Sequence, residues 1–551
     1  MLRIAVIADS HFHPAGRPTQ AAYPSDAEFN ARNAAAVARV RAAAPDLVIH
    51  LGDVVHPIPG LPEHERALGV ARQTYAELGV ELLVVPGNHD VGDKLHPWAP
   101  APSVSDAKHA VFRRWWGEPW WKVEFRGLTL VGLDSPLFNS GLPLEQAQWD
   151  WLDTALVPGR RTFVFLHYPL FLLTPDEPEH YDNIAEPART RLLERFAHAG
   201  VEAVFAGHVH HPFWNLHRGT DYYLLPSTAF VRPEYSELGR VGPGDEHGRN
   251  EVQRLGFGVL HVDPEGHELE WIRTGGATTV EPGVGPAAPP RCPLGLTLRH
   301  AWDAVLDLPA DGLDPFRRKR ARNDLVLLAV LELGVRLLRL PFDDLRCATT
   351  RERLQRLARR GVQVVLFTAD VLQDEDVELV QSESRWVRAV EWIRPRAALD
   401  APLPRLAVPS WVAPYGRHSS ESGAYFSHFA PLGFLPDDPD LSRVRADGAV
   451  FRLEETAEPN AVLERIAART PGLEAAVLAL TPRAGEGVAF VDDAALSARV
   501  VDLARAAAAH PALPVLLDTT VDHDRGYFPR IGLVDRAGNP RPAFWALRAS
   551  S

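Results

Sequence analysis

Five short apolar runs in the first part of the chain each end in aspartate, asparagine or histidine. The runs are Leu2 to Ala8, Leu47 to Leu51, Glu81 to Val85, Thr162 to Leu166 and Val201 to Ala206. The polar clusters that follow them are Asp9-Ser10-His11, Gly52-Asp53, Gly87-Asn88-His89-Asp90, His167 and Gly207-His208-Val209-His210. Runs that are apolar at nearly every position predict strands covered on both faces. The clusters would then meet at the carboxyl edge of an α/β sheet, where such folds bind ligands.

Alanine-rich helical patterns such as Asn30 to Ala44 and His64 to Leu78 separate these runs. Further strand-like runs lie at Leu128 to Leu133, Tyr222 to Leu225, Gly256 to Val262 and Leu269 to Arg273. The pattern predicts an α/β domain over residues 1–275. A stretch rich in Gly, Pro and Ala follows, and it predicts a linker at residues 276–290.

The second part, residues 291–551, alternates strand-like and helical patterns again. The strand-like runs are Val335 to Leu340, Val362 to Phe367, Arg388 to Ile393, Arg405 to Trp411, Ala449 to Leu453, Ala475 to Leu480, Pro514 to Leu517 and Ile531 to Val534. Helical patterns such as Arg351 to Arg360 and Ala494 to Ala509 lie between them. Eight strands with such crossovers predict a (β/α)8-type barrel. The closing segment, from Gly532 to Phe544, resembles the end of many glycosidase-type barrels.

Five carboxylates fall near the carboxyl ends of the predicted barrel strands, where barrel active sites form: Asp343, Asp344, Asp370, Glu391 and Asp518. A glycosidase would need two of them about 5–10 Å apart. The sequence selects no pair, and solvated carboxylates at strand ends are the simpler interpretation.

The clusters of the first part combine carboxylate and imidazole, which is the ligand set of Mn, Fe, Zn or Co. Asp-x-His and His-x-His would place two side chains on one side of an extended segment, because the strand period is two. Glycines before Asp53, Asn88 and His208 would let the backbone turn sharply. Seven candidate ligands are too many for one tetrahedral ion and suit two ions that share a bridge.

In this order, the five motifs resemble those of the calcineurin-like metallophosphoesterase superfamily, and their spacing resembles its cyclic-nucleotide and glycerophosphodiester phosphodiesterase branch. The resemblance covers residues 1 to about 275 and implies a four-layer α/β/β/α sandwich with two divalent or trivalent transition-metal ions. It implies one metal on Asp9, His11 and His210, a second on Asn88, His167 and His208, and a bridge by Asp53. It also implies that His89 protonates the leaving group or steadies the phosphoryl oxygens, while Asp90 orients His89. Spacing alone does not separate an acid at His89 from a further ligand.

Two departures from that branch leave the substrate open. The chain has His167-Tyr168-Pro169 where a second His is common, and Val54-Val55-His56 where an acidic residue or Asn is common. His56 and His211 lie next to the motifs, and each is either a solvated rim residue or a substrate contact. The basic run from Arg317 to Arg320 is interpreted as a solvated face.

The resemblance implies hydrolysis of a small phosphoester, foremost a phosphodiester, by a metal-bridging hydroxide. The alternatives are a phosphomonoesterase, a bifunctional enzyme whose barrel processes carbohydrate, and a non-catalytic metal-binding scaffold. A net charge of −13 gives no global basic field for a nucleic-acid polymer. No apolar run reaches the roughly 18 residues of a membrane span, and a cytoplasmic location is expected. A homo-oligomer remains open.

Overall fold

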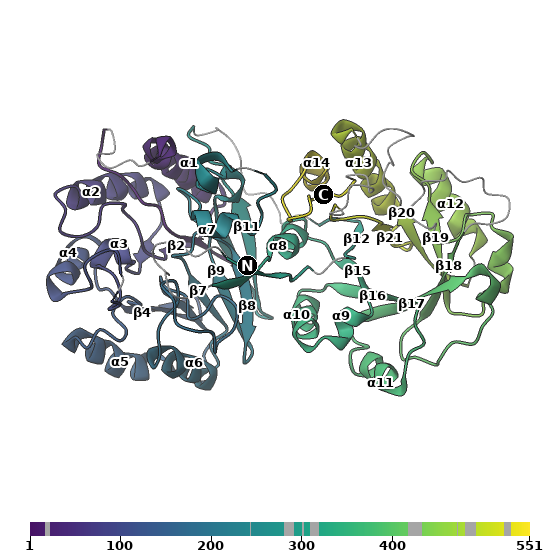
Figure 1. Cartoon of the computed structure of the whole chain (residues 1–551), viewed down its shortest axis with the longest axis horizontal. Helices are drawn as coiled ribbons and strands as arrows, with labels where there is room; N and C mark the ends of the chain where they lie inside the picture. Colours follow the sequence, from purple (N-terminus) through teal and green to yellow (C-terminus); the bar gives the residue numbers. More distant parts are fainter. Residues whose placement is uncertain are drawn as a thin grey trace. The chain divides into compact units, whose positions relative to one another are not determined.

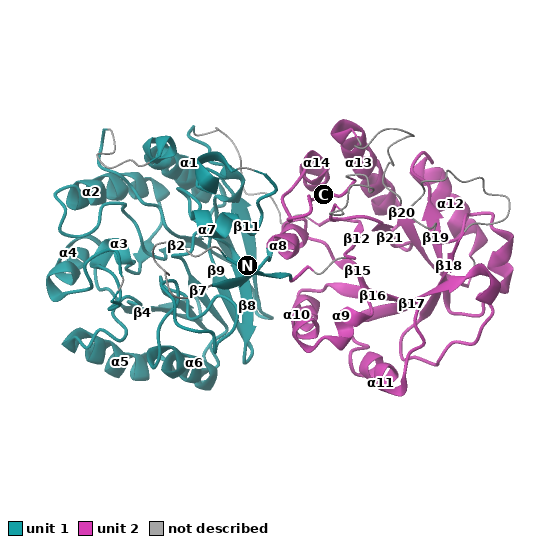
Figure 2. Ribbon diagram, viewed as in Figure 1, with its two compact units in different colours: residues 1–288, 304–324 teal, residues 289–303, 325–551 magenta. Residues whose placement is uncertain are grey.

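The computed structural model describes residues 1–16, 23–97, 99–242, 244–279, 291–299, 302–308, 319–416, 432–470, 472–479, 492–522 and 531–550 (Figure 1). The chain forms two compact units (Figure 2). Unit 1 comprises residues 1–288 and 304–324, and unit 2 comprises residues 289–303 and 325–551. Most of the predicted linker, residues 280–290, lies outside the described residues.

Among its described residues, unit 1 contains two large sheets and a two-stranded hairpin. The first has the order β11-β10-β1-β2-β3, with β1 (Leu2–Ile7), β2 (Leu47–His50), β3 (Leu82–Val84), β10 (Gly256–Val262) and β11 (His267–Arg273). The second has the order β4-β5-β6-β7-β9-β8, with β4 (Trp121–Phe125), β5 (Leu128–Gly132), β6 (Thr162–Phe165), β7 (Ala203–Ala206), β8 (Phe213–His217) and β9 (Thr220–Leu224). The strands that precede the predicted ligands are β1, β2 and β3 in the first sheet and β6 and β7 in the second. Within each sheet these strands pair in parallel, so their carboxyl ends lie at the same edge.

Helices cover the outer face of each sheet. Val37 of α1 (Phe29–Ala42) and Leu68 of α2 (His64–Tyr75) share a buried cluster with Val48 of the first sheet. Leu152 of α5 (Pro143–Ala155) and Phe196 of α6 (Ala188–Ala199) share another with the second sheet. Figure 1 shows α1 and α2 on one side of the unit and α5 and α6 on the other. The predicted four-layer sandwich is confirmed.

Three further helices are described in unit 1, of which α3 and α7 have only four residues each. They are α3 (Asn88–Val91), α4 (Asp106–Trp116) and α7 (Pro233–Ser236), with 3-10 turns at Pro24–Glu28, Ala76–Leu78, Asp245–Gly248 and Val252–Arg254. Between the sheets, aromatic rings stack: the ring of Phe205 lies 5.1 Å from that of Phe165 and 5.3 Å from that of Tyr223. A hairpin of β13 (Val305–Asp307) and β14 (Arg320–Arg322) also belongs to unit 1.

Unit 2 contains a closed barrel of eight parallel strands, which confirms the predicted barrel. Its order is β12-β15-β16-β17-β18-β19-β20-β21, with β12 (Gly295–Thr297), β15 (Leu337–Pro341), β16 (Gln363–Thr368), β17 (Val387–Pro395), β18 (Ser410–Tyr415), β19 (Gly448–Leu453), β20 (Glu474–Ala479) and β21 (Val515–Leu517). The helices are α8 (Leu325–Glu332), α9 (Asp343–Arg346), α10 (Ala348–Arg359), α11 (Asp374–Ser382), α12 (Pro459–Arg469), α13 (Asp493–Ala509) and α14 (Pro542–Ser550), with 3-10 turns at Arg396–Ala398 and Pro439–Arg443.

The strand set of the barrel differs from the prediction at both ends. The first strand is β12, which was not predicted because Gly295 and Thr297 interrupt its apolar residues. The predicted last strand, Ile531 to Val534, is not a barrel strand, since Val534 forms only isolated bridges to Val521 and Pro540. The barrel closes instead by pairing of β12 with β21.

The barrel carboxylates are not all solvated. Glu391 is fully buried and forms two hydrogen bonds of 2.6 Å with the guanidinium of Arg339. Asp518 is also buried and is paired with Arg299, while Asp343 lies on the surface. For Glu391 and Asp518 the solvated interpretation is therefore wrong. Among the described residues, no helix is both long and apolar enough to cross a membrane.

Candidate metal centre

The structure brings all seven predicted ligands together at the carboxyl ends of the strands. Asp9 and His11 follow β1, Asp53 follows β2, Asn88 begins α3 after the three residues that follow β3, His167 follows β6, and His208 and His210 follow β7. All seven side chains are buried. The two sheets therefore contribute to one site.

The backbone of the site is strained. Asp9, His11, Asp53, His208 and His210 all lie in the left-handed region, with φ between 45° and 69°. Non-glycine residues adopt this region rarely, and such strain gathers at functional sites. Each Asp-x-His or His-x-His pair converges through this backbone beyond the strand end. The explanation from the strand period of two is therefore wrong, although the pairing it predicted is present.

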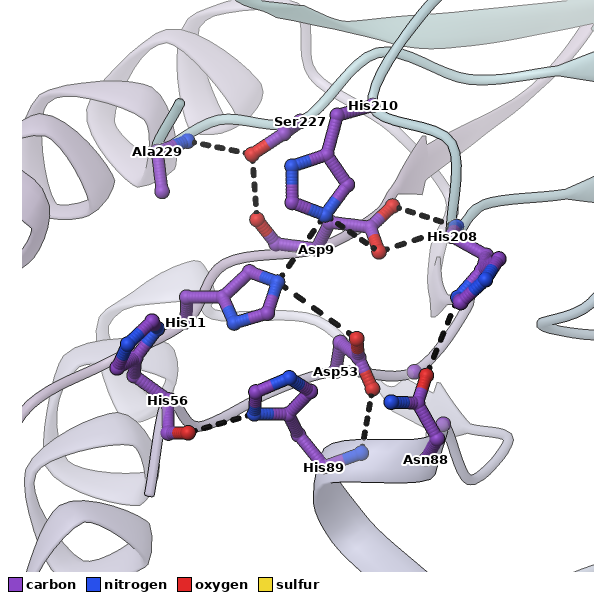
Figure 3. A network of polar contacts seen from close by, with 12 residues as sticks. Asp9, His11, Asp53, His56, Asn88, His89, His208, His210, Ser227 and Ala229 are labelled. Carbon is purple, nitrogen blue, oxygen red and sulfur yellow. Dashed lines mark hydrogen bonds and ion pairs between the residues drawn. The ribbon is translucent and has the colours of Figure 1, made fainter. Parts of the chain in front are cut away.

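The first group of ligand atoms comes from Asp9, His11, Asp53 and His210 (Figure 3). Nε2 of His11 lies 3.1 Å from Nε2 of His210 and 3.6 Å from Oδ2 of Asp53. Nε2 of His210 lies 3.3 Å from Oδ1 of Asp9. Around one first-row cation, neighbouring donor atoms are expected about 3 Å apart, because each lies about 2.0–2.2 Å from the ion.

The second group comes from Asp53, Asn88, His167 and His208. Oδ1 of Asn88 lies 2.9 Å from Nε2 of His167 and 3.1 Å from Nδ1 of His208, and the two ring nitrogens are 3.2 Å apart. Oδ1 of Asp53 lies 3.4 Å from Nε2 of His167. Asp53 thus directs one carboxylate oxygen to each group, an arrangement in which a carboxylate can bridge two cations.

In His167, His208 and His210, the ring nitrogen that points away from the ligand groups faces a hydrogen-bond acceptor, as expected for histidines that bind cations. Nδ1 of His167 faces the carbonyl of Leu51 at 2.9 Å, and Nδ1 of His210 faces that of Phe230 at 3.0 Å. Since a carbonyl only accepts, these nitrogens carry the proton and the inner Nε2 lone pairs face the site. Nε2 of His208 likewise faces a carboxylate, that of Asp182, at 3.2 Å. Lone pairs of His167 and His208 only 3.2 Å apart repel unless a cation or a proton lies between them.

Without a cation, a proton takes that place. Burial opposes the charged form of His167, but the carboxylates of Asp53 and Asp9 outweigh burial and raise its pKa to about 9. Burial also opposes the charged form of Asp53, yet His167 and His89 hold the pKa of that carboxyl well below its usual range.

Glycines allow the loops to approach this closely. A Cβ on Gly87 would lie 2.3 Å from the amide nitrogen and from Oδ1 of Asp53, and a Cβ on Gly207 would lie 2.6 Å from Oδ2 of Asp9. The carboxylate of Asp9 accepts the backbone N–H of His208 at 3.0 Å, and the Ser227 hydroxyl donates to the Asp9 carbonyl at 2.6 Å (Figure 3).

His89 lies beside the first group, but Asp90 does not orient its ring. The backbone N–H of His89 donates to Oδ1 of Asp53 at 2.8 Å, and its Nδ1 faces the carbonyl of His56 at 2.5 Å (Figure 3). The buried Asp90 carboxylate instead accepts the backbone N–H groups of Gly87 at 2.9 Å and Val54 at 3.2 Å. The expected Asp90–His89 hydrogen bond is therefore wrong, and Asp90 holds together the two loops that carry Asp53 and Asn88.

His56 and His211, the two histidines beside the motifs, lie in different environments. His56 lies in the site: its ring is 5.4 Å from that of His11 and 5.6 Å from that of His89, and the three could share a cation. His211 is fully buried, 4.9 Å from the ring of Phe213, so the rim interpretation is wrong for it.

Several site residues were missed by the sequence motifs. His13 contacts His56, with ring centroids 4.7 Å apart. Asp182, Arg232 and Lys319 form a buried ionic cluster behind His208. His13 follows His11 by two residues, so its nearness to that motif was a signal in the sequence. The three residues of the ionic cluster belong to no strand-end motif and lie far apart in the sequence, so only buried charge in the folded chain reveals them.

Comparison with known proteins gives a consistent assignment. Residues 2–212 match the family described as calcineurin-like phosphoesterase. The chain is 35% identical over 187 residues to the serine/threonine-protein phosphatase CPPED1 of Danio rerio, a match covering 32% of this chain and 58% of that protein. For human CPPED1 the identity is 32% over 228 residues, covering 39% and 67%. For a cAMP/cGMP dual specificity phosphodiesterase of Mycobacterium tuberculosis it is 26% over 249 residues, covering 44% and 70%.

Proposed function

Because this chain belongs to the calcineurin-like phosphoesterase family, we propose that it hydrolyses a small phosphoester, foremost a phosphodiester, at a dinuclear metal centre. The observation that carries this proposal is Asp53, whose two oxygens face two separate groups of buried nitrogen and oxygen donors. A scaffold that only bound metal would need neither this shared carboxylate nor the additional histidines beside it.

The residues of the centre have distinct roles in the proposal. Asp9, His11 and His210 hold one cation, Asn88, His167 and His208 hold the other, and Asp53 bridges them. Two bound cations of the Mn, Fe, Zn or Co type supply a hydroxide nucleophile near neutral pH and offset charge on the phosphoryl oxygens. The carbonyls behind His167 and His210 hold the proton on the outer Nδ1 of each ring, so that the inner Nε2 is the nitrogen aimed at the site.

His89 is proposed to act on the leaving group. Its Nδ1–H donates to the carbonyl of His56, so Nε2 is the nitrogen that can gain or lose a proton. As an imidazolium, it donates that proton to the departing oxygen, a role worth about 10²–10⁴-fold in rate. The neutral ring can only accept a hydrogen bond through Nε2.

His13 and His56 are proposed to contact the ester group of the substrate. Nε2 of His13 and Nδ1 of His56 are buried and have no hydrogen-bond partner among the described residues. A buried polar atom left unpaired costs about 1–3 kcal/mol. A substrate oxygen that reached either nitrogen would provide its missing partner. The relatives are named as a phosphatase and a phosphodiesterase, and for the present chain we propose a preference for diesters.

Hydrolysis of aryl and alkyl phosphates tests the function. Full-length protein loaded with Mn²⁺ should hydrolyse bis-aryl phosphate faster than mono-aryl phosphate, and Asn88→Ala should abolish turnover. His89→Ala should lose about 10²-fold or more with alkyl leaving groups and much less with nitrophenolate, which leaves without a proton. His198→Ala, an exposed histidine on α6, is the control and should match wild type. No metal-dependent turnover of any phosphoester by the wild-type chain would refute the proposal.

A further inference from the structure

A buried lysine from the β13–β14 hairpin reaches the wall of the metal centre. Lys319 has a fully buried side chain whose Nζ lies 2.8 Å from Oδ2 of Asp182. It directly precedes β14, and its carbonyl accepts the N–H of Leu308 across the hairpin at 2.8 Å. The interpretation of the basic run as a solvated face is therefore wrong for Lys319, although Arg320 beside it is exposed.

Asp182 connects this lysine to a metal ligand. Oδ1 of Asp182 lies 3.2 Å from Nε2 of His208 and 2.5 Å from Nη1 of Arg232. Oδ2 accepts from Lys319 and, at 2.7 Å, from the hydroxyl of Tyr235. Each carboxylate oxygen thus has two donors, so the plane of the carboxylate is fixed. A fixed carboxylate in turn fixes the tautomer and the rotation of the His208 ring.

The cluster is electrically balanced. Its carboxylates are Asp182 and Glu234, and its cations are Arg232 and Lys319, with Glu234 paired to Arg232 and lying 3.8 Å from Lys319. Loss of Lys319 would leave one buried negative charge uncompensated, and such charges are strongly unfavourable.

The hairpin is held firmly within unit 1. The guanidinium of Arg322 donates to the carbonyl of Trp214 at 2.9 Å and to the side chain of Asn215 at 2.6 Å, both on β8. Leu308 and Ala321 are buried in the core cluster that also contains Tyr235. These contacts place Lys319 at a defined position, so it can act as a rigid support.

We propose that Lys319 is a positioning residue for the metal centre, which acts through Asp182 to hold His208 in the orientation that binds the second cation. The phosphoesterase site, whose family match ends at residue 212, would then be incomplete without a hairpin about 100 residues further along the chain. The inference rests on the proposed function, but it concerns metal binding and can be tested without any turnover.

Two substitutions in the full-length chain isolate this role. Lys319→Met removes the ammonium but keeps most of the side-chain volume, and Arg320→Met is the matched control on the same hairpin. Titration of metal-free protein with Mn²⁺ should give two sites in wild type and in Arg320→Met. In Lys319→Met one of the two should weaken about 10–100-fold, the range for loss of groups that support metal ligands. With Co²⁺, the visible absorption band of one site should change in Lys319→Met only.

If Lys319→Met does not fold, Asp182→Asn tests the same role. Asp182→Asn retains the shape and removes the charge that the lysine balances, and it should weaken the same single site. Two sites of wild-type affinity and an unchanged Co²⁺ spectrum in a folded Lys319→Met or Asp182→Asn protein would overturn the inference. Wild-type protein that binds two Mn²⁺ but hydrolyses no phosphoester would refute the proposed function alone.

Discussion

At the scale of single residues, the ligands were predictable because each motif is local. Asp9, Asp53 and Asn88 all stand directly beyond an apolar run, where the end of a parallel strand must place them. What the motifs could not give is the conformation: the pairs converge through a left-handed backbone, which no pattern of apolar residues encodes. The partner of His89 was also unpredictable, because a carbonyl that accepts a hydrogen bond can belong to any residue.

The close approach at Gly87 gives a steric prediction. Gly87→Ala would place a Cβ 2.3 Å from the Asp53 amide, and backbone atoms on both sides cannot move apart freely. We expect a loss of about 2–3 kcal/mol in unfolding free energy and a much weaker metal affinity. Thermal unfolding with metal analysis measures both. Gly266→Ala, where nothing lies within 4 Å, is the matched control, and equal effects of the two would contradict the prediction.

Protonation of His167 gives a pH prediction. Its pKa of about 9 in the metal-free protein lies above the value of 6.5 in the unfolded chain. The charged ring therefore contributes its full stabilisation below pH 6.5, and this contribution is lost as the pH rises through 9. A cation must displace this proton, so metal affinity should rise up to tenfold per pH unit between pH 6.5 and 8.5. Calorimetric titration with Mn²⁺ in buffers of different ionisation enthalpy should show about one proton released at pH 7.5. Binding with no proton release would contradict it.

At the scale of elements, strands that lie in continuous apolar runs were predictable, including the three-residue strands β3 and β21. β8 and β4 lie at the two edges of the second sheet and were missed, since an edge strand needs neither an apolar run nor two covered faces. β12 was missed because Gly295 and Thr297 interrupt its apolar residues, yet it closes the barrel between β15 and β21. Its Gly295 fits there because a Cβ would lie 2.5 Å from the side chain of Leu516.

The ion pair between β15 and β17 gives a prediction for the barrel. Glu391→Leu would leave the buried Arg339 without its carboxylate and should destabilise unit 2 by about 3–5 kcal/mol. Arg339→Met together with Glu391→Leu removes both charges and should recover a large part of that loss. Denaturant unfolding measures the difference. A double variant no more stable than the single one would show that the pair is not coupled.

At the scale of the whole molecule, the alternation of elements predicted a sandwich and a barrel but not the path of the chain between them. Residues 304–324 are assigned to unit 1 although they follow the first residues of unit 2. Their polar anchors, Arg322 and Asp324, bind β8 residues more than 100 positions away in the sequence. Ion pairs at this separation leave no local pattern, so neither the hairpin nor its lysine could be placed beforehand.

The two-unit organisation predicts where metal stabilises the protein. A ligand that binds only the folded form of unit 1 stabilises that unit by about 2.7 kcal/mol at one hundred times its dissociation constant. All candidate ligands of the centre lie in unit 1, and so do the hairpin residues behind them. Addition of Mn²⁺ should therefore slow amide hydrogen exchange in β1, β7 and the β13–β14 hairpin and leave β16 to β20 unchanged. Lys319→Met should abolish the effect in the hairpin at Mn²⁺ concentrations that saturate only the wild-type chain. Equal protection of the barrel strands would show that the two units unfold together. If Mn²⁺ did not slow exchange in the hairpin of the wild-type chain, the hairpin would not be coupled to the metal centre.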